Sequence, residues 1–404
     1  MSASRPPIIL PPKTPIEESI PGYDPKRFLP VNPGDLLNNR YKTVVKVGWG
    51  STSTVWLAQD TQQYVLARNS NRHVTVKVTA SDCVDNEAAK HEQIITRHLK
   101  RNSSHQGFSF VRTMLDSFEI PGQNGPHLCL VYEPMREPLW LFQRRWENGK
   151  IQPALLKVYL RFLLRGLDYL HSECHIIHTD LKLDNILLGF EHPSVIEDFV
   201  RDGRSIYLSH NDFGPPKSFR ILPKIADFGL SQSGEGSEPL MHPIQPPLFH
   251  APEVILGTSW TYSADIWNLG VLIWNMMEAR DLFTHIRSSQ GEYDVRAHLA
   301  EMIAILGPHQ NEVKWSHSVP NREGKLCQTA REYYGGPFFN SEGDFMHRGL
   351  IPTDISLEDS VFSLGGEEKR MFLDFIKRML QWLPDERNTA KELLEHPWLQ
   401  EKST

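Results

Sequence analysis

Proline breaks up the hydrophobic pattern at the start of this 404-residue chain, and regular patterning begins only beyond it. Closely spaced prolines up to about residue 38 remove backbone donors and disfavour both helices and central strands. We therefore expect an extended arm over residues 1–38. From Tyr41 the chain changes to short β-branched runs bounded by turn residues, which predicts the strands of a small antiparallel sheet.

The first patterned region contains four predicted strands and one predicted helix. The strands are Tyr41 to Val47, Thr54 to Ala58, Val74 to Val78 and Leu128 to Tyr132, and the helix is Asn86 to Leu99. In the helix, Ile94, Ile95 and Leu99 lie near one face. These elements predict a strand-rich lobe over residues 39–135.

The second patterned region is longer and mostly helical. Its predicted helices are Leu155 to Leu170, Ser263 to Met277, Arg296 to Leu306 and Lys369 to Leu380. The order of elements predicts an α+β fold, in which the small lobe is followed by a larger helical lobe over 136–404 with a cleft between them. We expect insertions near 189–223 and 284–360.

Composition narrows the possible partners and surroundings. The formal net charge is −6, so bulk electrostatics give no sign of a nucleic-acid partner. Four well-separated cysteines without a CxxC pair argue against a zinc site or a disulfide framework and for a reducing compartment. The proline-rich start lacks the apolar stretch of a secretory signal, so we expect the cytosol or nucleus, with a mitochondrial address as the alternative. The longest apolar run, Ile266 to Met277, is too short to span a bilayer and contains two asparagines.

A glycine-containing turn joins the first two predicted strands and reads Gly48-Trp49-Gly50-Ser51-Thr52-Ser53-Thr54-Val55. Small residues there let backbone amides approach an anionic phosphate chain. Glycines at a hairpin more often simply make the turn, and Ser53 stands where a third glycine is usual in such loops. The loop becomes informative only together with other motifs. Its expected nucleotide-binding residues are Gly48, Trp49, Gly50, Ser51, Ser53 and Val55.

The strongest motif is His178-Thr179-Asp180-Leu181-Lys182-Leu183-Asp184-Asn185. It resembles the catalytic loop of protein kinases at the required offsets. The resemblance implies that Asp180 accepts the proton of the substrate hydroxyl, that Lys182 steadies the γ-phosphate and that Asn185 binds magnesium. A lysine at position 182 also resembles serine/threonine rather than tyrosine kinases.

The same resemblance assigns further ATP-binding residues in the first lobe. Lys77 ends the run Val74-Thr75-Val76-Lys77, similar to the kinase strand whose lysine contacts the α- and β-phosphates. Its partner should be a glutamate on the following helix, and spacing favours Glu92 over Glu87. Glu133 and Met135, just after the strand that ends at Tyr132, are the expected hinge residues.

A second magnesium ligand has three candidates, Asp198, Asp212 and Asp227, each followed by phenylalanine. Spacing from Asn185 alone favours Asp198. Asp227 follows the apolar run Lys224-Ile225-Ala226, which resembles an approach strand. Asp212 has no such run before it, and two prolines come shortly after its Phe-Gly pair. We therefore expect Asp227 to bind the metal.

Three more residues are expected to support the site structurally. Ala251-Pro252-Glu253 ends a segment from Asp227 that has the length of a kinase activation segment. The kinase resemblance implies that Asp265 anchors the backbone of the catalytic loop and that Arg387 pairs with Glu253. An isolated exposed arginine is the alternative for Arg387.

Additional motifs resemble one branch, the SR-protein kinases, and suggest a divergent, fungal type. They are Gly22-Tyr23, Gly34-Asp35-Leu36, Arg40-Tyr41, Gly48-Trp49-Gly50, Thr54-Val55-Trp56-Leu57, His178-Thr179-Asp180, Ser263-Ala264-Asp265-Ile266-Trp267 and Glu395-His396-Pro397-Trp398-Leu399. The resemblance covers about residues 20–404. It implies a bilobal kinase fold, ATP and Mg²⁺ as cofactors, arginine/serine-rich splicing factors as protein partners, and residence in cytoplasm and nucleus.

The chain also departs from this branch. Thr179 replaces the usual arginine that senses a phosphorylated activation segment, so we expect activity without such phosphorylation. Alanines at 297 and 304 stand where docking acids are expected, and Glu292, Asp294 and Glu301 are the acids that could compensate. Pro246-Pro247-Leu248-Phe249-His250 replaces an arginine- and glutamine-rich stretch. The alternatives to an SR-type kinase are a pseudokinase scaffold, a kinase with other substrates, and a small-molecule kinase.

Overall fold

The computed structural model describes residues 24–50, 52–62, 73–81, 83–99, 104–203, 213–214, 216–217, 221–236, 239–307, 314–320, 325–329, 338–340 and 344–400. Contacts divide the chain into two compact units. The first comprises Met1–Ser103, Val111–Pro138 and Leu187–Leu230, and the second comprises Ser104–Phe110, Leu139–Ile186 and Ser231–Thr404. In the part of the chain that is described, no helix combines the length and apolar character that a membrane span needs.

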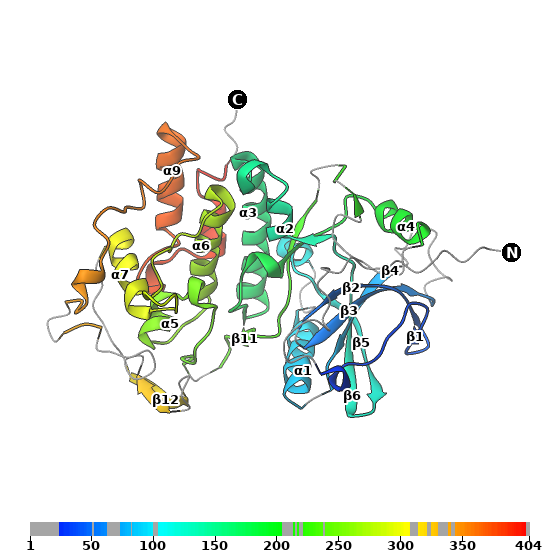
Figure 1. Ribbon diagram of the computed structural model, residues 1–404. Helices are drawn as coiled ribbons and strands as arrows, with labels where there is room; N and C mark the ends of the chain where they lie inside the picture. The colour runs from blue at the N-terminus through cyan, green and yellow to red at the C-terminus, as the bar shows by residue number, and fades with distance from the viewer. Residues whose placement is uncertain are drawn as a thin grey trace. The chain divides into compact units, whose positions relative to one another are not determined.

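A six-stranded antiparallel sheet with the order β1-β2-β3-β4-β6-β5 is the main feature of the first unit (Figure 1). The strands are β1 (Leu36–Leu37), β2 (Tyr41–Trp49), β3 (Ser53–Asp60), β4 (His73–Thr79), β5 (Met114–Gly122) and β6 (Gly125–Tyr132), and the helix of this unit that follows β4 is α1 (Cys83–His98). The four strands and the helix predicted here are present. The pattern missed β5, because only Met114 of that edge strand is buried.

Successive residues of β6 serve two separate cores, as the period of two in a strand requires. Leu128, Leu130 and Tyr132 pack with Ala89 of α1. Cys129 and Val131 face the other side and join a cluster with Tyr41, Trp56, Val74, Val76 and Val78 from the neighbouring strands. The sheet is therefore buried on both faces around β4 and β6.

The insertion after β9 (Ile186–Leu188) belongs to this first unit. Its helix α4 (Ser194–Arg201) places Ile196 and Phe199 against Val45 and Leu57 of the sheet. This corrects the predicted boundary, which left 189–223 with the helical lobe. The physical reason is the apolar stripe of α4, which is buried on the sheet rather than left in solvent.

The second unit is mostly helical. Its helices are α2 (Leu139–Gln143), α3 (Pro153–Asp168), α5 (Pro252–Leu256), α6 (Ser263–Glu278), α7 (Val295–Leu306), α9 (Gly366–Lys377) and α10 (Ala390–Leu394). The pairs β8 (Ile176–Ile177) with β11 (Gln232–Ser233) and β12 (Lys314–Pro320) with β13 (Leu326–Thr329) are short. The predicted α+β fold and its long helices are confirmed.

Helix α3 is central to the second unit and runs beside α6 (Figure 1). Pro153 begins the helix at a position where its missing N–H costs nothing. Leu156, Leu160, Leu163 and Leu167 are buried along one stripe of this helix. The preceding short segment Gln106–Phe110 packs so closely on α3 that a Cβ at Gly107 would lie 1.9 Å from the Arg165 carbonyl oxygen. That contact explains why residues 104–110 group with this unit.

Candidate active site

The glycine turn forms the hairpin between β2 and β3, in which Gly48 lies opposite Val55 and Trp49 opposite Thr54. The Gly50 amide donates to the Ser53 carbonyl at 2.8 Å. The backbone of Ser53 does not have a positive φ, so a side chain at this position imposes no backbone strain. Trp49 is exposed and Ser53 is buried, while Ser51 lies outside the described residues.

Lys77 on β4 is paired with Glu92 on α1, at 2.7 Å between Nζ and Oε2. Glu92 is 4% exposed, whereas the alternative partner Glu87 is exposed. Asp227 Oδ1 lies 3.7 Å from Lys77 Nζ in the same unit. Burial lowers the pKa of Lys77, but the nearby carboxylates of Glu92 and Asp227 outweigh this effect and hold the pKa above its ordinary value. Lys77 is therefore charged at all physiological pH values.

The three aspartate candidates occupy different environments. Asp227 follows β10 (Pro223–Ile225) and has a φ of 65°, a left-handed conformation that is unusual for aspartate. Asp198 lies on α4 with its side chain about half exposed, and its carboxylate pairs with Arg201 at 3.2 Å. Asp212 lies outside the described residues. Of the two described candidates, Asp227 is the one beside Lys77.

The predicted hinge residues follow β6. The Glu133 carboxylate forms an ion pair with Lys224, and its backbone carbonyl accepts from Arg112 Nη2 at 2.9 Å. Met135 is half-buried. The next amide, that of Arg136, donates to the Leu188 carbonyl at 2.8 Å, which ties this segment to β9.

Asp265, near the start of α6, fixes the catalytic loop in the second unit. Its two carboxylate oxygens accept from the His178 amide at 2.7 Å and the Thr179 amide at 2.9 Å. His171 Nε2 lies 2.9 Å from the same carboxylate. Thr179 has a φ of 66°, and a buried carboxylate that accepts two amides stabilises this strained turn. His178 is fully buried, and its Nδ1 accepts from the Asp180 amide at 3.3 Å, so its role is structural.

Within the loop, Asp180 lies between Lys182 and Asn185. Asp180 Oδ2 accepts from Lys182 Nζ at 2.7 Å and from Asn185 Nδ2 at 2.9 Å. Asn185 also donates to the Asp180 carbonyl at 2.9 Å. Asp180 and Asn185 are both less than a tenth exposed. The loop thus presents a carboxylate whose orientation is fixed by two donors.

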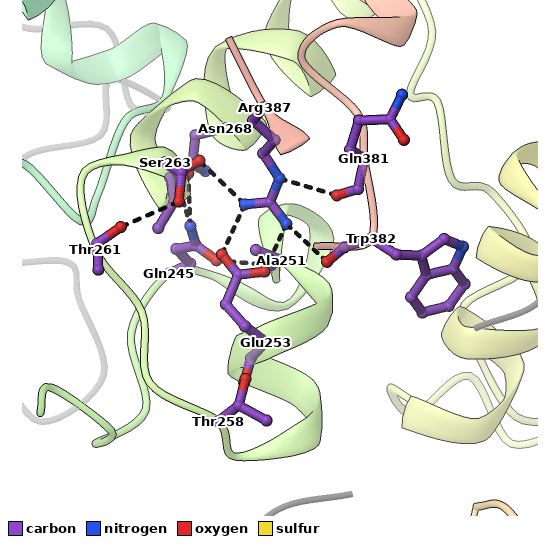
Figure 2. A network of polar contacts seen from close by, with 11 residues as sticks. Gln245, Ala251, Glu253, Thr258, Thr261, Ser263, Asn268, Gln381, Trp382 and Arg387 are labelled. Atoms are coloured by element: carbon purple, nitrogen blue, oxygen red, sulfur yellow. Dashed lines mark hydrogen bonds and ion pairs between the residues drawn. The ribbon is translucent and has the colours of Figure 1, made fainter. Parts of the chain in front are cut away.

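Glu253 and Arg387 form a buried bidentate ion pair, shown in Figure 2. The two hydrogen bonds measure 2.7 and 2.6 Å. Arg387 also donates to the carbonyls of Ser263 and Gln381, and its guanidinium lies 5.0 Å from the ring centroid of Trp267. The guanidinium nitrogens of Arg387 thus donate both to a carboxylate on α5 and to backbone carbonyls. These bonds hold α5, α6 and the segment before α10 together.

Gln245 is a structural residue of this region that the sequence did not reveal (Figure 2). It has a φ of 70°, its Oε1 accepts from the Ala251 amide at 2.8 Å, and its Nε2 donates to Asn268 Oδ1 at 2.6 Å. Asn268 in turn donates to the carbonyl of Leu181 in the catalytic loop at 3.4 Å. A glutamine in a proline-rich stretch carries no sequence signal for this connection.

The sequence predicts that acids near α7 compensate for the missing docking acids at positions 297 and 304, but two of these acids have other partners. Glu301 is 1% exposed and accepts from the amides of Thr284 and His285 at 2.9 and 2.8 Å. Asp294 caps the first turn of α7 and forms two side-chain hydrogen bonds with Arg296. The prediction that Glu301 compensates for the missing acids is therefore wrong, because its carboxylate is buried against the loop before the helix. Glu292 is exposed.

A groove of about 800 Å³ adjoins the catalytic loop within the second unit. Lys182 and Asp184 of the loop line it together with Asp281, Arg144 and three residues of the proline-rich stretch, Pro246, Leu248 and Phe249. Asp184 is exposed, and Asp281 accepts from Asn275 at 2.9 Å. The groove therefore combines two carboxylates and two cations, Lys182 and Arg144, with apolar walls.

Comparisons with known proteins agree with this geometry. The protein kinase domain model matches residues 41–399. A serine/threonine protein kinase of Aspergillus fumigatus is 36% identical over 96% of this chain and 95% of its own length. The serine/threonine-protein kinase SRPK of Physarum polycephalum is 28% identical over 95% of this chain and 91% of its own length.

Two further matches agree with these relatives. SRSF protein kinase 3 of Homo sapiens is 34% identical over 53% of this chain and 37% of its own length. The crystal structure of the PF14_0431 kinase domain matches with a TM-score of 0.67 over 93% of this chain and all of that one, at 22% identity, and supports the fold alone.

The chain belongs to the protein kinase family, as its catalytic loop and two-unit α+β fold indicate. More closely, it is a protein serine/threonine kinase related to the SR-protein kinases.

Proposed function

We propose that this kinase uses magnesium-ATP and that the residues described above perform the transfer to a serine or threonine hydroxyl. The observation that supports this most directly is the cluster of Lys77, Glu92 and Asp227, with separations of 2.7 and 3.7 Å from Lys77. A lysine held by one carboxylate beside a second one suits the binding of phosphates together with a metal ion.

The residues fit magnesium rather than a metal held by protein ligands alone. Among the described residues, no group of three or more histidines, cysteines, aspartates or glutamates could hold a metal ion. Mg²⁺ is usually bound by one or two protein ligands together with water and phosphate oxygens. Asp227, whose side chain is about half exposed, would supply a carboxylate, and Asn185 would supply its amide oxygen. When bound, the ion neutralises charge on the phosphates.

Asp180 is the residue that would accept the proton of the substrate hydroxyl. Its Oδ2 accepts from Lys182 and Asn185, so Oδ1 is the oxygen that we expect to accept from the incoming hydroxyl. Lys182 holds the Asp180 carboxylate by a hydrogen bond of 2.7 Å and would bring positive charge to the transferred group. Phosphoryl transfer needs such positioning more than covalent participation by the protein.

The proposed substrates are proteins rich in arginine and serine, such as splicing factors. The relation to kinases named for SRSF proteins supports this class. The groove beside the catalytic loop offers the carboxylates of Asp184 and Asp281 as local acceptors, although Lys182 and Arg144 in the same lining balance their charge. Carboxylates attract guanidinium groups through charge-assisted hydrogen bonds. The absence of acids at 297 and 304 argues for weaker binding of long basic peptides than is usual in this branch. We also propose residence in cytoplasm and nucleus, which a fluorescent fusion would test.

Labelled ATP and a panel of arginine–serine, proline-directed and acidic peptides test the proposal. The expected result is transfer to serine in the arginine–serine peptide and loss of transfer when EDTA removes Mg²⁺. ATP binding without transfer to any peptide would identify a pseudokinase scaffold instead. Transfer only to the other peptides would leave the kinase mechanism in place and remove the substrate class.

A further inference from the structure

Both carboxylate oxygens of Glu92 are engaged in the first unit, although only one of them meets Lys77. Oε2 accepts from Lys77 Nζ at 2.7 Å, and Oε1 accepts from Tyr132 Oη at 2.8 Å. Burial, and secondarily the Glu92 charge, raise the pKa of Tyr132 well above its ordinary value. The tyrosine therefore stays protonated and donates at every physiological pH.

Arg112 holds the ring of this tyrosine. Its guanidinium carbon lies 4.6 Å from the Tyr132 ring centroid, and Nη2 donates to Thr75 Oγ1 at 2.6 Å and to the Glu133 carbonyl at 2.9 Å. A planar guanidinium suits stacking and forked hydrogen bonding at once, which a lysine would not reproduce. Arg112, anchored to Thr75 on β4 and to the carbonyl of Glu133, thereby holds the Tyr132 ring in place.

The backbone of Arg112 contacts the strand that leads to Asp227. The Arg112 amide donates to the Ile225 carbonyl at 2.8 Å, and Val111 pairs with Ile225 in a parallel bridge. Arg112 therefore touches the approach to Asp227 through its main chain and the support of Glu92 through its side chain. Its positive charge partly opposes the rise in the Lys77 pKa that the carboxylates of Glu92 and Asp227 cause, so two cations and two carboxylates lie near one another.

We propose that Tyr132 and Arg112 are positioning residues for the Lys77–Glu92 pair in the phosphoryl transfer proposed above. A carboxylate held through one oxygen can rotate about its side-chain bonds, whereas a second donor fixes its plane and hence the place of the lysine ammonium. Tyr132 supplies that second donor, and Arg112 keeps the tyrosine ring in position. Misplacement of a positioning group by about 1 Å costs roughly 10²-fold in rate when geometry is critical, so a partial loss is expected here.

Tyr132→Phe tests the claim because it removes only the hydroxyl. We expect kcat to fall by about 10-fold with a smaller change in KM for ATP, since the interaction lost supports the lysine in the reacting complex. Tyr41→Phe is a matched control, because Tyr41 Oη donates to Asp116 at 2.6 Å in the same sheet. It should lower the thermal unfolding midpoint by a similar amount and leave kcat unchanged.

A double-mutant cycle separates positioning from a general effect on folding. In a Glu92→Leu background, the further change Tyr132→Phe should alter the residual kcat less than about two-fold, because the tyrosine acts through the glutamate. Arg112→Met should lower kcat by roughly three- to ten-fold, and its effect should not multiply with that of Tyr132→Phe. If Arg112→Met fails to fold, the tyrosine cycle still decides.

Two results would overturn the inference: a kcat for Tyr132→Phe within two-fold of the parent, or an equal loss in both Glu92 backgrounds. A parent enzyme that transfers no phosphate would instead contradict the proposed function. In that case the affinity for magnesium-ATP decides the positioning claim, which requires weaker binding by Tyr132→Phe than by Tyr41→Phe.

Discussion

Asp227 and Asp198 are each followed by phenylalanine, but their surroundings give them different chemistry. Asp227 lies 3.7 Å from Lys77, whereas Asp198 is on the solvent side of a helix whose Phe199 packs on the sheet. Asp180 is fixed by Lys182 and Asn185. The function of an aspartate here follows from the element that carries it.

We predict that Asp180→Ala and Asp227→Ala each abolish transfer of labelled phosphate. Asp198→Ala and Asp212→Ala should retain most of the parent activity, and circular dichroism should show all four variants folded. Inactive but folded Asp212→Ala together with active Asp227→Ala would mean that the insertion has been assigned to the wrong segment.

His250 should make folding sensitive to acid. Burial lowers its pKa to about 4, while Nδ1 lies 3.1 Å from Tyr293 Oη and Nε2 3.0 Å from the Gln245 carbonyl. Burial likewise lowers the pKa of His298, 3.0 Å from the same hydroxyl. Between pH 6.5 and 4 the unfolded chain binds more protons than the folded one, so stability falls as pH falls.

From pH 7 to pH 5, His250 alone should cost about 2 kcal/mol of unfolding free energy in urea titrations. The variant His250→Gln, which cannot take up a proton, should lose less stability over the same interval. Identical pH dependence in the two proteins would show that other groups cause the acid sensitivity.

At the scale of elements, the Glu253–Arg387 pair joins α5 to the C-terminal part of the second unit. Both side chains are at most 1% exposed, so removal of one partner leaves the other charge buried. We predict that Arg387→Ala lowers the unfolding free energy by about 3–5 kcal/mol. Arg370→Ala, which breaks an exposed pair with Glu367 on α9, is the matched control and should leave the unfolding midpoint unchanged.

Helix α7 should limit the affinity for basic substrates. Ala297 and Ala304 are partly exposed and uncharged, while Glu301 is buried against the amides of Thr284 and His285. The double variant Ala297→Asp, Ala304→Glu should lower KM for a long arginine–serine peptide at low salt, and the gain should shrink as salt rises. An unchanged KM, or tight binding by the parent, would place recognition elsewhere.

At the scale of the whole molecule, the described part of the segment from Asp227 to Glu253 is held by hydrogen bonds of its own side chains and backbone. Ser231 is fully buried and donates to the His178 carbonyl at 3.2 Å. β11 pairs with β8, and Gln245 connects the segment to α6. Thr179 offers no guanidinium to a phosphate on Ser231, Ser233 or Ser237, and Ser237 lies outside the described residues.

We therefore predict that enzyme produced in bacteria and treated with phosphatase keeps its activity towards the best peptide of the panel. Mass spectrometry should confirm that no phosphate remains on the segment. Loss of turnover after this treatment, with recovery on rephosphorylation, would show that the segment needs a modification.

The sequence by itself determined the features that depend on short offsets along the chain. Local patterns predict the catalytic loop from His178 to Asn185, the hairpin at Gly48 and the alternation in β2, β3, β4 and β6. In each of these features, the side chains that act together are only a few residues apart in the sequence.

Only the tertiary structure decided which distant groups meet. Spacing could rank Glu92 above Glu87, but burial of one face of α1 on the sheet is what brings Glu92 to Lys77. The same holds for the burial of Glu301, the links made by Gln245, the contact of Arg112 with Tyr132, and the packing of α4 on the sheet. Each depends on surfaces far apart in sequence that become neighbours only when apolar area is buried, which no local pattern records.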